Sequence, residues 1–222
     1  MNILLIVALI FTALEALALQ KNYPRLEVVA KPAVMVALFF WLWTSTGLNG
    51  ALLWFGLGIL LSLLGDVLLM ISLDRLFLAG LAAFLLAHLA YVIGFNTPAP
   101  DVSAWGFLLV LMIGIGGMRI MRRIISPLAA QGQAGLRLPI IVYGLVISIM
   151  LLSAMLKLTD ISWKAGAALL VAFGAFLFYL SDIILAWMKF IAPIQNGRIY
   201  NILSYHLGQI ALIAGVVIQF KH

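Results

Sequence analysis

The sequence predicts an all-α protein, a polytopic membrane bundle of about eight transmembrane helices. Of its 222 residues, 66% are hydrophobic and only 9% are charged, whereas a soluble globular domain is roughly 45–50% apolar and about 25% charged. A water-soluble fold of this size could not bury so much apolar surface, so lipid must be the solvent. The apolar residues also gather into long runs, and a run of about 20 residues spans roughly 30 Å of hydrocarbon as a helix.

Eight such runs are separated by turn and helix-breaking residues such as Asn49-Gly50 and Pro193. We predict helices at residues 3–19, 31–46, 51–71, 76–95, 104–118, 138–156, 163–188 and 199–219. The second and fifth runs are short and the seventh is long, which predicts tilt or helix ends outside the bilayer. No connection is long enough for a second domain, so residues 1–222 are expected to form a single transmembrane domain. No Lys or Arg precedes the first run and Glu15 interrupts it, so we expect a retained helix rather than a signal peptide.

The basic residues are distributed unevenly between the two ends of the predicted bundle. One end carries Lys21, Arg25, Lys31, Arg75, Arg119, Arg122, Arg123, Arg137, Lys189 and Arg198, and the other carries Lys157, Lys164 and Lys221. Cytoplasmic loops retain the excess of Lys and Arg. We therefore expect both termini to be non-cytoplasmic, in a protein of a bacterial inner membrane. Because topology accounts for the net charge of +6, the expected partner is the lipid bilayer and not nucleic acid. The sequence predicts no oligomeric state.

Several kinds of catalytic site are excluded or poorly supported by the residue types present. The chain has no cysteine, which excludes disulfides, thiolate metal sites and cysteine nucleophiles. No G-x-S-x-G elbow is present, so a serine nucleophile is poorly supported. Hydrolytic zinc sites usually have three protein ligands, which Asp66, Asp182 and His206 could in principle supply here. We predict no metal and no cofactor.

The most informative residues are polar groups at membrane depth, because a charge there is costly and usually functional. Asp66 and Asp182 each lie about 8–9 Å inside the cytoplasmic end of a predicted helix. The same half of the bundle also contains Glu15, Lys31, Tyr143, Tyr205, His206 and Gln209. This convergence predicts a site that opens toward the cytoplasmic leaflet. The alternative for the aspartates is structural, since either could form an ion pair with Lys31. Lys31 itself could snorkel from the first turn of its helix, or it could bind phosphate.

Three other residue groups have a mainly structural interpretation. Glu15 is closer to the loop than the aspartates and is interpreted as an interfacial carboxylate. His88 shares a helix face with Phe84 and Tyr91, but lies roughly 18 Å deep by helical rise. That depth is mid-membrane rather than level with the aspartates, which favours a buried structural histidine. The glycines at positions 56, 58, 114, 116 and 117 are interpreted as sites of close packing or flexibility.

Taken together, the motifs resemble the YhhN family of integral membrane proteins, which includes the lysoplasmalogenases. The matching residues are Lys31-Pro32, Ser62, Gly65-Asp66, Phe77, Gly80-Leu81, Phe84-Leu85, His88, Tyr91, Tyr143-Gly144, Met150, Ala154, Gly174-Ala175, Phe178, Ser181-Asp182, Ala186, Tyr205 and Gln209. The resemblance covers nearly the whole chain, and the combination is specific although each piece alone is weak. His206 lies outside this pattern.

The resemblance implies hydrolysis of the vinyl ether bond of a lysoplasmalogen, which yields a fatty aldehyde and a glycerophospho-ethanolamine or -choline. It also implies that Asp66 and Asp182 are the catalytic pair. Two carboxylates in different environments can divide the roles of general acid and base. The remaining candidates are assigned to substrate binding, and they are Lys31, Tyr143, Tyr205, Gln209 and His88. Among them, Lys31 is the candidate for binding the lipid phosphate.

Two alternatives remain open at this point. The bundle could hydrolyse another lysophospholipid, with or without a metal. It could instead be a proton-coupled transporter or a lipid-binding membrane protein, in which the aspartates relay protons or bind an amine. The absence of visible inverted repeats and of paired broken helices argues against a transporter.

Overall fold

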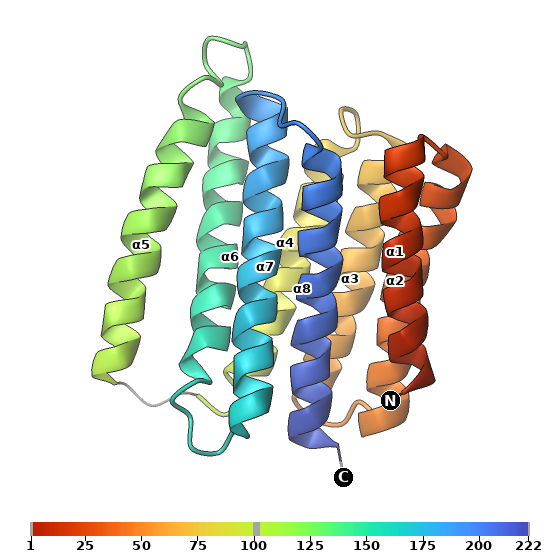
Figure 1. Ribbon diagram of the computed structural model, residues 1–222. Coiled ribbons are helices and arrows are strands. Elements are labelled where there is room, and N and C mark those ends of the chain that lie inside the picture. The colour runs from red at the N-terminus through yellow and green to blue at the C-terminus, as the bar shows by residue number, and fades with distance from the viewer. Residues whose placement is uncertain (1, 100–102, 222) are drawn as a thin grey trace.

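The computed structural model describes residues 2–99 and 103–221, and within these ranges the chain is helical with no strand (Figure 1). Its long helices are α1 (Ile3–Lys21), α2 (Pro24–Thr46), α3 (Leu52–Ile71), α4 (Phe77–Phe95), α5 (Ala104–Ile125), α6 (Arg137–Leu156), α7 (Ala165–Phe190) and α8 (Gly197–Phe220). A short 3-10 turn, Ala134–Leu136, precedes α6. All eight helices are long and apolar enough to cross a membrane. The predicted multi-pass membrane bundle is confirmed.

Two helices extend beyond the apolar runs from which they were predicted. Helix α2 begins at Pro24 and not at residue 31, so Pro32 lies inside the helix instead of in its first turn. Helix α5 continues to Ile125 and not to residue 118, with Arg122 and Arg123 in its last turn. The reason is the same in both cases. A helix can continue into the headgroup layer, where charged side chains are solvated. In α5 the two arginines of the last turn also interact favourably with the helix dipole.

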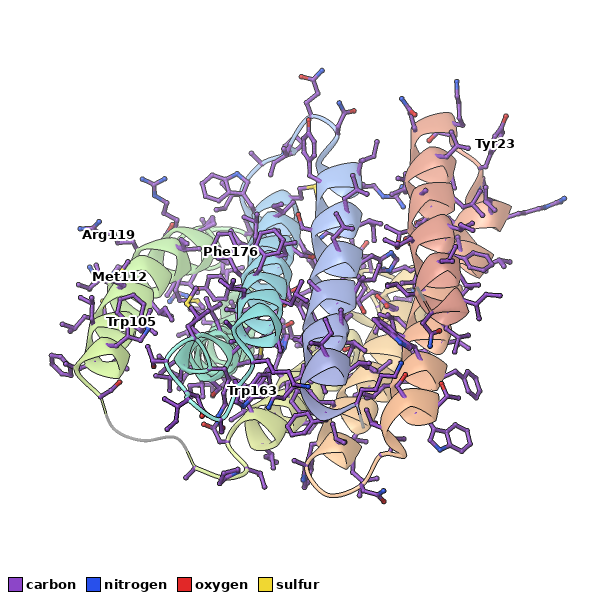
Figure 2. All side chains as sticks on the ribbon, turned by 60° about the horizontal axis from the view of Figure 1, so that its bottom comes forward. Tyr23, Trp105, Met112, Arg119, Trp163 and Phe176 are labelled. Carbon is purple, nitrogen blue, oxygen red and sulfur yellow. The ribbon has the colours of Figure 1, made fainter. Side chains whose placement is uncertain are left out.

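Consecutive helices run in opposite directions, with α8 inside the bundle and α5 at its edge. Helix α8 packs against α7, α1 and α2, while α3 pairs with α4 and α4 also contacts α6. Helix α5 contacts α6 and α7, and Figure 1 shows it at the outer edge of the bundle. Figure 2 shows Trp105 and Met112 on the flank of α5 that faces away from the other helices. Because α8 is central, side chains from most of the other helices can meet it.

Helices α7 and α8 approach each other so closely at their glycines that no side chain would fit between the two backbones there. A Cβ atom added at Gly174 would lie 2.5 Å from the backbone nitrogen of Leu212, and one at Gly215 would lie 2.6 Å from the carbonyl oxygen of Ala167. Small residues permit this backbone-to-backbone packing in membranes. Near its N-terminal end, α8 is held to α7 by Asn201, whose Nδ2 donates to the Ser181 carbonyl at 2.8 Å and to the Ser181 hydroxyl at 2.9 Å. This contact fixes the backbone beside Asp182.

Candidate active site

Asp66 lies between a lysine from α2 and a tyrosine from α8. The Lys31 Nζ is 3.1 Å from Asp66 Oδ1, and the Tyr205 hydroxyl donates to Asp66 Oδ2 at 2.7 Å. Each carboxylate oxygen therefore has its own donor. The Asp66 side chain is 1% exposed and that of Lys31 is 15% exposed. Such a buried carboxylate is stable as an ion only because it is paired and hydrogen-bonded.

Asp182 has a different set of partners, from α4 and α6. The Tyr143 hydroxyl donates to Asp182 Oδ2 in a short hydrogen bond. The His88 Nε2 lies 2.9 Å from the Tyr143 hydroxyl and 3.4 Å from Asp182 Oδ2. The Asp182 side chain is 17% exposed, whereas that of His88 is fully buried. The two aspartates thus have unlike environments, one beside an ammonium group and the other beside a phenol and an imidazole.

The predicted separation of His88 from the level of the aspartates is wrong. Because α7 extends to Phe190, Asp182 lies eight residues, or about 12 Å, from that helix end. His88 lies eleven residues from the start of α4 at Phe77, or roughly 16 Å along its helix. The remaining difference of about 4 Å is within the reach of the side chains. Depth counted from each helix's own end does not decide whether two side chains meet.

A second hydrogen-bonded group lies one helical turn from the Asp66 group. The Tyr91 hydroxyl donates to Gln209 Oε1 at 2.8 Å, and Gln209 Nε2 donates to Ser62 Oγ at 3.1 Å. Ser62 precedes Asp66 by four residues and Gln209 follows Tyr205 by four, so both groups occupy the same helix faces. Ser62, Tyr91 and Gln209 are all fully buried. This group connects α3, α4 and α8 beneath the Asp66 group.

A third polar group joins α1 to α8. The His206 Nδ1 lies 3.2 Å from Glu15 Oε2, and both side chains are fully buried. The interfacial position expected for Glu15 is therefore wrong. Among the described residues, neither side chain has a well-oriented hydrogen-bond partner. The reason for the burial is the position of α1, which packs with both α2 and α8 and so turns one face inward.

Two cavities meet at Asp182. The first, the polar cavity, has a volume of about 440 Å³ and reaches the ends of α2, α3, α7 and α8. Its polar lining residues are Glu27, Lys31, Asp66, Ser72, Ser181, Asp182, Lys189, Arg198, Asn201 and Tyr205. The second, the apolar groove, has a volume of about 410 Å³ and runs between α4, α5, α6 and α7. The residues that line both are Leu69, Phe84, Asp182 and Leu185.

The rim of the polar cavity carries two cations in addition to Lys31. Arg198 Nη2 lies 2.6 Å from Glu27 Oε1, and Lys189 Nζ lies 3.0 Å from Asp74 Oδ1. Both cations were counted in the sequence only as evidence for topology. Their positions carried a signal, since Lys189 follows Asp182 by seven residues on the same helix face. Asn201 precedes Tyr205 by four residues and was missed in the same way.

The five residues predicted to bind substrate do not all reach a cavity. Lys31 and Tyr205 line the polar cavity, and Tyr143 lines the apolar groove. His88 and Gln209 are described residues that line neither cavity, and both are fully buried. His88 contacts Asp182 and Tyr143. Gln209 contacts Tyr91 and Ser62. These contacts hold other side chains in place.

Asp66, Asp182 and His206, the possible zinc ligands of the sequence, do not come together in the structure. Within residues 2–99 and 103–221, no group of three or more His, Cys, Asp or Glu side chains is placed to hold a metal ion. His206 is paired with Glu15 and does not join Asp66 and Asp182 in such a group. The site is therefore described by its carboxylates, tyrosines, histidine and lysine.

The sequence pattern of the YhhN family matches residues 26–216, which include both aspartates and all the residues that line the polar cavity. The chain belongs to the YhhN family. Lysoplasmalogenase TMEM86B of Homo sapiens is 28% identical over 188 residues, which are 82% of this chain and 70% of the human protein. Lysoplasmalogenase TMEM86B of Mus musculus is 28% identical over 196 residues, or 87% of this chain and 76% of the mouse protein. No solved structure matches this YhhN-family protein. Its resemblance to the family, drawn from scattered motifs, is confirmed.

Proposed function

We propose that this protein is a membrane-embedded hydrolase that cleaves the vinyl ether bond of lysoplasmalogens, releasing a fatty aldehyde and a glycerophospho-ethanolamine or -choline. The observation that carries the proposal is the position of Asp182, where a cation-rimmed polar cavity meets an apolar groove. Membership of the YhhN family and the similarity to proteins named lysoplasmalogenase support the same activity.

The two cavities match the two halves of a single-chain phospholipid. Lys31, Lys189 and Arg198 around the polar cavity can attract the phosphate. The apolar groove can hold the hydrocarbon chain, since its lining is almost entirely apolar side chains. The vinyl ether joins these two halves, so a lipid bound in this way places that bond at the junction, beside Asp182.

The unlike partners of the two aspartates suit different roles in this chemistry. Protonating Asp66 would break its ion pair with Lys31, whereas Asp182 is paired with no lysine or arginine among the described residues. We therefore assign Asp182 as the general acid and Asp66 as the carboxylate that stabilises positive charge and accepts a proton from water. In this arrangement His88 and Tyr143 orient the acid, and Tyr205 orients the base.

With these roles, the hydrolysis proceeds in four steps. The Asp182 proton is transferred to the vinyl carbon distant from the ether oxygen, and the π electrons form the new C–H bond. The resulting oxocarbenium ion is attacked by water, which gives up its proton to Asp66. The hemiacetal then collapses as its carbon–glycerol oxygen bond breaks, its hydroxyl proton passing to the leaving oxygen. Return of the proton from Asp66 to Asp182 through water restores the starting state.

The direct test measures aldehyde release from a lysoplasmalogen by purified protein in detergent. Asp66→Asn and Asp182→Asn should each lower turnover by about 10²–10⁴, the usual contribution of acid–base groups. Asp160→Asn, in the loop at the opposite end of the bundle, is the control and should retain wild-type turnover. Turnover within about tenfold of wild type for both site variants would overturn the assignment.

We further propose that the polar cavity opens to the cytoplasm of a bacterial cell and that both termini lie on the other side of the inner membrane. Ten of the thirteen Lys and Arg residues lie toward the cavity end, which supports this orientation. The chain has no cysteine, so single cysteines can be placed at Ala130 and at Ile161, in loops at opposite ends. A membrane-impermeant maleimide should label Ile161→Cys on intact cells and Ala130→Cys only after lysis. The reverse pattern would invert the topology.

A further inference from the structure

The apolar groove is bordered by α5, whose side chains are the least buried of the eight long helices. Only Leu109 and Ile124, near the two ends of α5, are buried. Between them the helix faces α6 and α7 across the groove, and Figure 1 shows α5 as the outermost helix on that side. The residues between Leu109 and Ile124 are exposed or half-buried, and several of them line the groove.

Gly114, in the middle of α5, differs from the glycines that bring helices together. A Cβ added at Gly114 would meet no atom within 4 Å, although Gly114 lines the groove. A Cβ at Gly208, on α8, would lie 2.9 Å from the backbone of α7. Gly208 is therefore explained by packing and Gly114 is not. The missing side chain at Gly114 leaves the groove wider by the volume that a larger residue would occupy.

The groove is continuous with the site through Asp182 and Tyr143, which both line it. Its volume of about 410 Å³ lies at the lower end of the range for small-molecule pockets, roughly 300–1,000 Å³. It has room for one hydrocarbon chain beside the site. Asp182 and Gly114 both line this groove, so a hydrocarbon chain lying in it from Asp182 can extend past Gly114.

We propose that the groove is the binding subsite for the alkenyl chain and that Gly114 sets the length of chain it accepts. The inference rests on the proposed hydrolase function and adds a specificity-determining residue to it. A bulky side chain at position 114 would shorten the groove without moving a helix, because the space in front of that position is open.

The test compares Gly114→Phe with Gly116→Phe on the same helix. A Cβ at Gly116 also meets nothing within 4 Å, but Gly116 does not line the groove. Aldehyde release is measured with octenyl and hexadecenyl lysophospholipids. The ratio of kcat/KM for the long substrate to that for the short one should fall at least about tenfold in Gly114→Phe, or about 1.4 kcal/mol. Gly116→Phe should keep the wild-type ratio. An unchanged ratio in Gly114→Phe, or an equal change in both variants, would overturn the proposal.

A binding measurement separates this proposal from the hydrolase assignment. A hexadecyl ether lysophospholipid has the same shape but no vinyl group, so it can bind without being cleaved. It should raise the melting temperature of the wild type and of Gly116→Phe more than that of Gly114→Phe. If the wild type releases no aldehyde from either alkenyl lipid but this pattern holds, the hydrolase assignment fails and the chain subsite stands. If all three proteins are stabilised equally, the chain subsite fails whatever the activity.

Discussion

The ion pair between Lys31 and Asp66 should stabilise the bundle far more than an ordinary surface pair. We consider Lys31→Met, which keeps a long side chain but removes the ammonium group 3.1 Å from Asp66 Oδ1. Breaking a buried ion pair by removing one partner typically costs about 3–5 kcal/mol, because a charge is left buried and uncompensated. The Tyr205 hydroxyl still donates to Asp66, and the Lys31 side chain is 15% exposed. Both facts place the expected loss near the lower value.

A loss of about 3 kcal/mol corresponds to a fall of roughly 6–12 °C in melting temperature for a chain of this size. Thermal unfolding in detergent, followed by circular dichroism, measures this change. The matched control is Glu27→Gln, which breaks the pair with Arg198 at the rim of the same cavity. The side chains of that pair are 68% and 20% exposed, so the control should cost only about 0–1 kcal/mol.

A double variant provides a second test of the Lys31–Asp66 ion pair. In the double variant Lys31→Met with Asp66→Asn, no uncompensated charge remains, so the protein should melt above Lys31→Met alone. If Lys31→Met melts no lower than Glu27→Gln, or if adding Asp66→Asn lowers the melting temperature further, the pair does not act as a buried ion pair.

Three further predictions test other parts of the structure. Gly174→Val should separate α7 from α8 and cost about 1–3 kcal/mol or more by overpacking, measured as a fall in melting temperature. Tyr143→Phe removes a hydrogen bond to the carboxylate of Asp182, worth about 1.5–3 kcal/mol, and should lower the rate of aldehyde release about tenfold or more while the protein remains folded. Slight burial of Asp160 raises its pKa, but the hydrogen bonds from Ser162 and Lys157 and the charge of Lys157 together leave the pKa below the model-compound value of 3.8. A lowered folded-state pKa contributes stability above the unfolded value that is lost as the pH falls through the folded one, so the difference in melting temperature between wild type and Asp160→Asn should shrink below about pH 4. A difference that grew on acidification would contradict this sign.

The sequence predicted the parts of the site that depend on the membrane as solvent. An aspartate inside an apolar run is costly in lipid wherever it lies, so Asp66 and Asp182 stood out without a structure. Their convergence followed from counting residues along alternating helices. Which partner each carboxylate would take did not follow, because that depends on helix tilt and rotation. The proximity of His88 to Asp182 was missed for that reason.

The glycines show why the apolar groove could not be predicted. In the sequence, Gly58 and Gly114 are equivalent small residues in apolar helices. In the structure, a Cβ at Gly58 would collide with the Tyr91 ring, whereas one at Gly114 would meet nothing within 4 Å. A glycine can therefore mark either the closest contact or an open space. Only the positions of the neighbouring helices distinguish these two cases.

Asp182 lies between a polar and an apolar environment, and this has a consequence for the products. Cleavage of the proposed substrate there yields one water-soluble fragment in the polar cavity and one oily fragment in the apolar groove. Each fragment is then already in the compartment that dissolves it, so the two can depart by different exits, one to the aqueous phase and the other sideways past α5 into the bilayer. Recombination would need both to return together, and product inhibition by either fragment alone should be weak.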